Sequence, residues 1–140
     1  MCGIAGYLGS IDAAWLEQAN HWQAHRGPDD RGCFHAALGP GMAVGLAHTR
    51  LAILDPSPLG HQPMSAAGGA VQLVFNGEIY NFRALRAELE SEGVVFRGHS
   101  DSEVLVQLYL REGIACLERL NGIFALAIWD GSSRQLHVAR

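Results

Sequence analysis

The sequence predicts a single α+β domain in which short strands slightly outnumber helices. Apolar residues follow a period of two in some segments and a period of 3.6 in others, which is typical of mixed folds. The 17 glycines punctuate these segments and keep the elements short. The chain has 140 residues, 49% of them hydrophobic, which suffices for one core and excludes two full domains.

Charge and hydropathy exclude several classes of partner. Ten Lys and Arg against 14 Asp and Glu give a net charge of −4, and no basic cluster is present. Such a chain is a poor candidate for binding nucleic acid or an anionic membrane. No apolar run reaches the roughly 18 residues that span a bilayer. The N-terminus lacks the basic segment of a signal peptide, so we expect a cytoplasmic protein.

The first part of the chain is predicted to form a strand and a helix. Residues 4–8 are short and apolar, which is typical of a buried strand. Asp12 is placed to cap a helix that runs to about Gln23. The apolar face of this helix is formed by Trp15, Leu16, Ala19 and Trp22, so this face is expected to pack on the core.

A polar loop at residues 25–30 separates this helix from a predicted hairpin. The loop cannot continue the helix, because Pro28 disfavours helical backbone at Gly27. Residues 32–37 and 42–48 have the composition of two strands and are joined by a short Gly-Pro-Gly turn.

The middle of the chain combines a loop with a buried strand. A short apolar piece at 51–54 is followed by residues 55–69, which hold three of the five prolines and are expected to be irregular. Residues 70–75 have the composition of a buried strand. This strand is predicted to end at Asn76-Gly77, a strong turn signal.

The second half of the chain is predicted to contain two capped helices and more strands. Asn81 begins one helix, which ends at Gly93. The capping box Ser100-x-x-Glu103 begins another, which ends at Gly113. The remaining predicted elements are a strand at 94–97, a helical turn at 114–120 and paired strands at 122–129 and 135–139. Because the chain stops straight after its last strand, we expect a truncated domain or the front of a longer protein.

Cys2 follows the initiator methionine directly. If Met1 is removed, one residue owns both a thiol nucleophile and an α-amine that titrates close to neutral pH and can act as its base. With Met1 retained, this base is an amide and is lost. Taken alone, Cys2 is more consistent with an incidental small residue in a first strand.

Other polar residues also have two interpretations. The side-chain amide of Asn76 and the N–H of Gly77 can converge on a developing oxyanion, or the pair can be a plain turn. Arg50 can bind an α-carboxylate and Asp101 an α-ammonium, so that together they recognise a free amino acid. Separately they are consistent with a surface charge and a helix-dipole residue.

The cysteines and histidines do not predict a metal site. Cys2, Cys33 and Cys116 form no CxxC pair, and the seven histidines show no ligand spacing. A Cys/His metal or redox module therefore has only composition in its favour. His48 and His61 are interpreted as structural, and the loop at 25–29 is either a solvated turn or part of a site.

Taken together, the motifs resemble one family over nearly the whole chain. The motifs are CGIAG (2–6), HRGPD (25–29), HTRLAILD (48–55), FNGEIYN (75–81), SDSEV (100–104) and GIFALAIWD (122–130). In this order they resemble class II glutamine amidotransferase domains, in the asparagine synthetase branch rather than the branch that makes glucosamine 6-phosphate.

This resemblance implies a fold and a reaction. The fold is the N-terminal-nucleophile hydrolase αββα sandwich, two stacked antiparallel sheets flanked by helices, here without its C-terminal part. The implied reaction is glutamine hydrolysis, in which Cys2 attacks the side-chain amide and a γ-glutamyl thioester forms. Asn76 and Gly77 would form the oxyanion hole. The implied substrate-binding residues are Arg50, Leu51, Ile53, Leu54, Glu78 and Asp101, and Arg26 and Asn81 would order the site.

The resemblance also implies partners that lie outside these residues. The ammonia would pass to a synthetase domain, in cis or in trans, where ATP and Mg²⁺ activate aspartate. Nothing in this chain matches the pyrophosphate loop of that domain, so no cofactor is expected here. Amidation of another carboxylate, a homodimer of the full-length protein, and an inactive fragment that binds a partner through its last strand are open alternatives.

Overall fold

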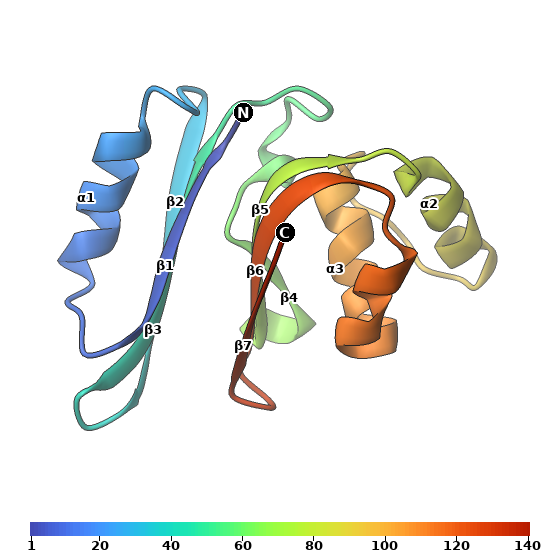
Figure 1. Ribbon diagram of the computed structural model, residues 1–140. Helices are drawn as coiled ribbons and strands as arrows, with labels where there is room; N and C mark the ends of the chain where they lie inside the picture. Colours follow the sequence, from blue (N-terminus) through green and yellow to red (C-terminus); the bar gives the residue numbers. More distant parts are fainter.

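The protein is a stack of four layers in the order helix, sheet, sheet, helix. The computed structural model describes residues 1–140. Figure 1 shows α1 against the outer face of one sheet and α2 and α3 against the outer face of the other. The elements are β1 (Gly3–Gly9), α1 (Ala14–Gln23), β2 (Asp30–Gly39), β3 (Met42–Arg50), β4 (Met64–Ala66), β5 (Val71–Ile79), α2 (Phe82–Ser91), α3 (Asp101–Glu112), β6 (Gly122–Asp130) and β7 (Gln135–Ala139), with 3₁₀ turns η1 (Pro58–Gly60), η2 (Ala67–Gly69) and η3 (Gly113–Arg119).

The first sheet has the strand order β1-β3-β2 and is antiparallel throughout. Its central strand, β3, is buried on both faces, because side chains on a strand alternate between two packed layers. Ala43 and Ala47 pack with Leu16 of α1. Val44 and Leu46 point the other way and pack against the second sheet.

The second sheet has the strand order β4-β5-β6-β7 and is also antiparallel. Its outer face carries the largest core cluster, in which Leu73 and Ile128 of the sheet pack with Leu105 and Leu108 of α3 and Leu89 of α2. Together with the smaller clusters between the sheets and under α1, this arrangement confirms the predicted αββα sandwich.

The strand β5 is longer than the sequence predicts. Its pairing with β6 continues from Val71 to Ile79 without a break in register, so Asn76-Gly77 lies within a strand and the predicted turn is wrong. At Gly77 a Cβ atom would collide with the carbonyl oxygen of Ile123 and the Cα of Phe124 on β6. The glycine is therefore required by the close approach of two strands.

The predicted strand at 94–97 is also wrong. Its backbone is bonded by a side chain and not by a neighbouring strand, since the Glu103 carboxylate accepts the N–H groups of Arg97 at 2.7 Å and Gly98 at 2.8 Å. Glu103 is the last residue of the predicted capping box, and Ser100 Oγ does accept the Glu103 N–H. The box therefore starts α3 while its acidic residue organises the preceding loop.

Three smaller predictions need correction. The 55–69 segment is not wholly irregular, because Met64–Ala66 form β4 and pair with β5. Asn81 precedes α2 but its side chain caps nothing. Trp22 of α1 is 62% exposed, and the buried positions of that helix are Leu16, Ala19 and Asn20.

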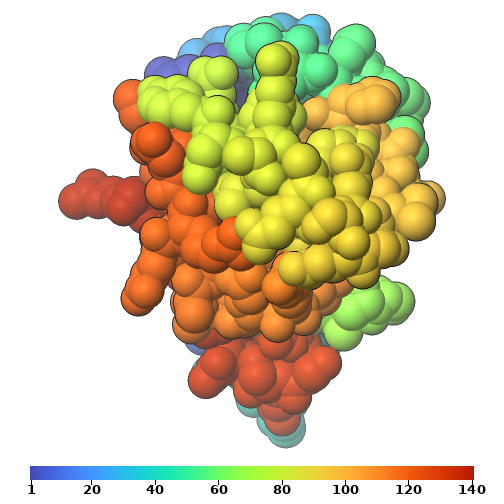
Figure 2. Space-filling view, turned by 90° about the vertical axis from the view of Figure 1, so that its right-hand side faces the viewer, coloured from blue at the N-terminus to red at the C-terminus, as the bar shows by residue number.

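The helical side of the molecule is closed by α2 and the segments around it. Figure 2 shows residues of α2 and the following loop in yellow and η3 in orange across this face, with the β6–β7 turn in red at the lower end. None of the helices combines the length and the hydropathy needed to cross a bilayer.

His48 occupies the space between the two sheets. It is fully buried, its Nε2 lies 3.1 Å from the carbonyl oxygen of Phe75, and its Nδ1 has no partner. Burial lowers the pKa of His48 from 6.5 to about 4, because a second N–H and a positive charge would have no compensating acceptor. The structural role predicted for His48 is consistent with this environment.

The His48 environment predicts an acid-sensitive stability. Between pH 6.5 and about 4 the unfolded chain binds a proton that the folded state excludes, so stability falls as pH falls through this window, by a total of about 3 kcal/mol. In His48→Gln, whose amide can donate to the same carbonyl, this component of the pH dependence is expected to disappear. Urea unfolding of both proteins at several pH values measures the difference. Parallel pH profiles would contradict the assignment.

Candidate active site

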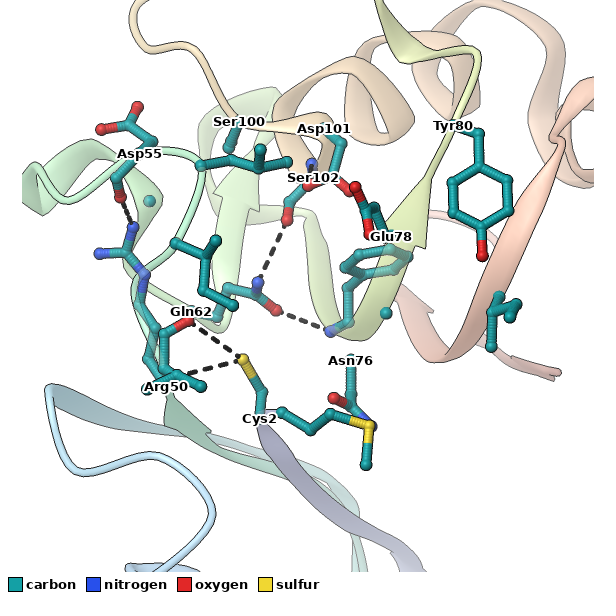
Figure 3. A pocket seen from close by; sticks show the side chains of 18 residues that line it. Cys2, Arg50, Asp55, Gln62, Asn76, Glu78, Tyr80, Ser100, Asp101 and Ser102 are labelled. Atoms are coloured by element: carbon teal, nitrogen blue, oxygen red, sulfur yellow. Dashed lines mark hydrogen bonds between the residues drawn. The ribbon is translucent and has the colours of Figure 1, made fainter.

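A cavity of about 300 Å³ lies where β1 begins and β3 ends. Figure 3 shows the Cys2 sulfur pointing into it, with Arg50 on one side and Glu78 and Asp101 across from them. Every residue predicted for catalysis or substrate binding lines this cavity, namely Cys2, Arg50, Leu51, Ile53, Leu54, Asn76, Gly77, Glu78 and Asp101. The structure thus brings together residues that are far apart in the sequence.

Strand register places Cys2 beside Arg50. Gly3 is opposite Thr49 and Ile4 is opposite His48 in the β1–β3 pair, so one further step brings Cys2 opposite Arg50. Ile4 packs against the core between the sheets. Since side chains alternate along a strand, Cys2 faces the same way, toward the second sheet.

The Cys2 thiol and backbone are held by neighbouring groups. The sulfur accepts the Leu51 N–H at 3.4 Å and lies 3.8 Å from the Leu51 carbonyl oxygen. Arg26 Nε donates to the Cys2 carbonyl oxygen at 3.0 Å. Arg26 lies outside the cavity and contacts the residue that carries the thiol, consistent with a site-ordering residue. Met1 is bonded to the α-nitrogen of Cys2, is exposed, and also lines the cavity.

Asn76 and Gly77 approach the thiol from β5. Val74 packs in the core between the sheets, so Asn76, two residues on, also faces the first sheet. Figure 3 shows Asn76 beside Cys2. The N–H groups of Phe75 and Ile79 point to the edge of β5 away from β6, where side chains of Gln62 and Asp101 accept them. The Gly77 N–H lies between them on the same edge and faces the cavity.

Arg50 presents a buried positive charge. It is 7% exposed and forms no ion pair with any carboxylate. Its guanidinium donates instead to the backbone carbonyls of Asp55 and of Ser57, the latter at 2.9 Å. Because carbonyl dipoles orient the guanidinium without neutralising it, the charge is available to a carboxylate ligand.

The opposite side of the cavity is acidic. Asp101 is buried and Glu78 is exposed, and neither forms an ion pair. Burial raises the pKa of Asp101, and the charge of Glu78 raises it further. A cationic ligand between them would relieve both effects. The cavity therefore has one cationic and one anionic side, which complements a zwitterionic amino acid.

Asp55 and Gln62 also line the cavity, although neither is predicted as a site residue from the sequence. The Asp55 carboxylate accepts the N–H groups of Ser57 at 2.9 Å and His99 at 2.8 Å. Hydrogen bonding from Ser57 lowers the pKa of this carboxyl. The spacing Asp55-x-Ser57 is a local turn signal, but the bond to His99 spans 44 residues and has no sequence signature.

Asn81 does not reach the cavity. Its side chain donates to the carbonyl of Arg119 at 2.9 Å and accepts the N–H of Asn121 at 3.0 Å. It therefore fixes the start of α2 against the turn before β6, and any effect on the site is transmitted through β5 and β6.

The fold is the αββα sandwich of the N-terminal-nucleophile class, with a cysteine at the start of the first strand and a cavity lined from both stacked sheets. A family model described as a glutamine amidotransferase domain matches residues 1–140. The chain belongs to this family.

Curated relatives match the chain along its whole length. A putative glutamine-hydrolysing asparagine synthetase of Mycobacterium tuberculosis is 41% identical over 143 residues, which cover 99% of this chain and 22% of that protein. Asparagine synthetase 1 of Bacillus subtilis is 37% identical over 147 residues, covering 100% of this chain and 22% of that protein. The chain thus spans about a fifth of the length of these relatives.

A solved structure shares the fold. Glutamine phosphoribosylpyrophosphate amidotransferase from B. subtilis, complexed with ADP and GMP, superposes with a TM-score of 0.66 at 23% identity. The match covers 93% of this chain and 35% of that one. At this identity the likeness concerns the sandwich architecture.

The buried Asp55 carboxylate predicts a stability effect. Asp55→Ala leaves two backbone N–H groups without their acceptor, and loss of such charge-assisted bonds costs about 2–4 kcal/mol. Chemical denaturation measures this change. The control is Asp12→Ala, which removes one exposed bond to the Ala14 N–H and is expected to cost about 1 kcal/mol or less. Equal losses in the two variants would contradict the role given to Asp55.

Proposed function

We propose that this chain hydrolyses the side-chain amide of glutamine. One observation carries the proposal: the Cys2 thiol shares a cavity with an unpaired buried guanidinium and with two unpaired carboxylates. Arg50 would bind the α-carboxylate of the substrate, while Glu78 and Asp101 bind its α-ammonium. Backbone near Leu51, Ile53 and Leu54 would hold the chain between these groups, and the amide would reach Cys2.

The nucleophile requires removal of Met1. The free α-amine of Cys2 then takes the thiol proton, directly or through a water, and the sulfur attacks the amide carbon. The carbonyl oxygen gains the negative charge and accepts hydrogen bonds from the Asn76 side chain and the Gly77 N–H. As the C–N bond breaks, the α-ammonium returns its proton to the leaving nitrogen and ammonia departs.

The γ-glutamyl thioester is then opened by water. The α-amine accepts a proton from the attacking water, the same two donors hold the second oxyanion, and the C–S bond breaks to release glutamate and regenerate the thiol. This reaction uses only groups of the chain itself, so no metal or cofactor is required of these residues.

The fate of the ammonia is part of the proposal. Relatives named as asparagine synthetases support delivery to a synthetase domain that uses ATP and Mg²⁺ to amidate aspartate. Another relative, Amidase chry2 of Gibberella zeae, is 41% identical over 125 residues, covering 89% of this chain and 18% of that protein. Another acceptor therefore remains the alternative. The proposed setting is cytoplasmic, where glutamine and ATP are available and thiols stay reduced.

The nucleophile is tested by substitution. Cys2→Ala is expected to abolish glutamate release from glutamine, because no other residue in the cavity carries a thiol. Glutamate is measured in a coupled assay, and an intact mass establishes that Met1 is absent. Cys33→Ala is the matched control, since Cys33 is exposed on β2 away from the cavity, and it should retain full activity. Normal turnover by Cys2→Ala would refute the proposed mechanism.

The carboxylate-binding role of Arg50 predicts a change in KM. Arg50→Lys keeps the charge but loses the planar fork that binds a carboxylate through two hydrogen bonds, so KM for glutamine should rise about tenfold to hundredfold. The value of kcat should change much less. Steady-state kinetics compare the Arg50→Lys variant with Arg83→Lys, a control on the exposed face of α2. An unchanged KM in Arg50→Lys would show that another group binds the carboxylate.

A further inference from the structure

The edge of β5 nearest the cavity has no neighbouring strand. The short strand β4 pairs only with residues 71–73 of β5. Beyond that point the backbone groups of Phe75, Gly77 and Ile79 point to an open edge, because alternate residues of a strand direct their N–H groups to the same side. The Tyr80 N–H, by contrast, points across to Asn121 at the end of β6.

A single buried side chain ties this edge to two other elements. Gln62 is 5% exposed. Its Oε1 accepts the Phe75 N–H at 2.6 Å and its Nε2 donates to Ser102 Oγ at 3.2 Å. Both ends of the amide are therefore used (Figure 3). The loop between β3 and β4 is joined to β5 one residue before Asn76, and to α3 one residue after Asp101.

The location of these bonds has a specific chemical consequence. Phe75 precedes the two donors of the proposed oxyanion hole, so a shift of its backbone moves the Asn76 amide and the Gly77 N–H together. Oxyanion donors act on charge that develops only in the transition state. Of the residues that would bind the ends of the substrate, Arg50 is held by the carbonyls of Asp55 and Ser57, and Asp101 accepts the N–H groups of Ile79 and Ser102. Gln62 makes no hydrogen bond to Arg50, Glu78 or Asp101.

We propose that Gln62 is a positioning residue for the oxyanion hole. This inference rests on the proposed glutaminase function and deepens it. Gln62 does not touch the reacting atoms. It fixes the backbone of β5 at Phe75 so that the donors at 76 and 77 meet the substrate carbonyl in the productive geometry.

The test compares variants of the Met1-processed protein. Gln62→Met has a similar volume and neither hydrogen bond, and its kcat should fall about tenfold to hundredfold with KM unchanged. Gln62→Glu keeps an oxygen for the Phe75 N–H and a second for the Ser102 hydroxyl, so it should recover much of the loss. Should Gln62→Met fail to fold, Gln62→Asn replaces it. The shorter Asn side chain places its amide oxygen too far from the Phe75 N–H to accept the hydrogen bond that Gln62 accepts.

A second readout separates positioning from damage to the nucleophile. Alkylation of Cys2 by iodoacetamide, followed by mass spectrometry, uses no oxyanion donor and should proceed at the wild-type rate in every variant. The matched control is Gln72→Met. Gln72 is also buried, and its Nε2 donates to the Ser65 hydroxyl at 3.0 Å, but it lies at the far end of β5 from the cavity. Its kcat should remain that of the wild type.

The outcomes distinguish the two proposals. Absence of glutaminase activity in the processed wild-type protein would refute the proposed function. An active wild type with an undiminished kcat in Gln62→Met would overturn only the role of Gln62. That role would also be overturned by a rise in KM in place of a fall in kcat, by slower alkylation of Cys2, or by an equal loss in Gln72→Met.

Discussion

The incomplete pairing of β5 is the constraint on which the site depends. Because β4 is only three residues long, the strand runs on with one edge unpaired, and buried backbone N–H groups need partners. Side chains of Gln62 and Asp101 supply them at Phe75 and Ile79. Between these two positions the Gly77 N–H faces a cavity. The same interruption of the sheet thus creates both the space for a ligand and a hydrogen-bond donor directed into it.

The buried charged side chains of the cavity are also bonded to backbone groups and not to opposite charges. Arg50 is oriented by backbone carbonyls of the loop after β3, and a buried guanidinium without a carboxylate is costly. The Asp101 carboxylate accepts the N–H groups of Ile79 and Ser102, and its burial disfavours the charged form. A zwitterionic ligand would compensate both sides at once. The chain itself leaves the charges on the two sides of the cavity without ionic partners, which favours binding of a free amino acid over a neutral molecule.

The sequence was informative where the signal is local. Alternation and glycine punctuation predicted most strands, and the family motifs supplied the residues of the cavity. Prediction failed where contacts between distant elements decide the structure. Asn76-Gly77 has a turn signal but lies in a strand, because pairing with β6 continues through it. The 94–97 segment has strand composition, but Glu103 binds its backbone. Gln62 and Asp55 could not be found, since the bonds from Gln62 to the Phe75 N–H and from Asp55 to the His99 N–H join separate elements and have no sequence signature.

Backbone amide NMR of the Met1-processed protein tests the central claim, that the open Gly77 N–H faces the Cys2 thiol. A diazo ketone analogue of glutamine alkylates a thiol and leaves its ketone next to the sulfur. If the account is right, the adduct forms on Cys2 and the Gly77 amide proton moves downfield as it donates to that ketone, while the amide of Phe75, already bonded to Gln62, moves little. An adduct on another cysteine, or a Gly77 resonance that does not move, would contradict it.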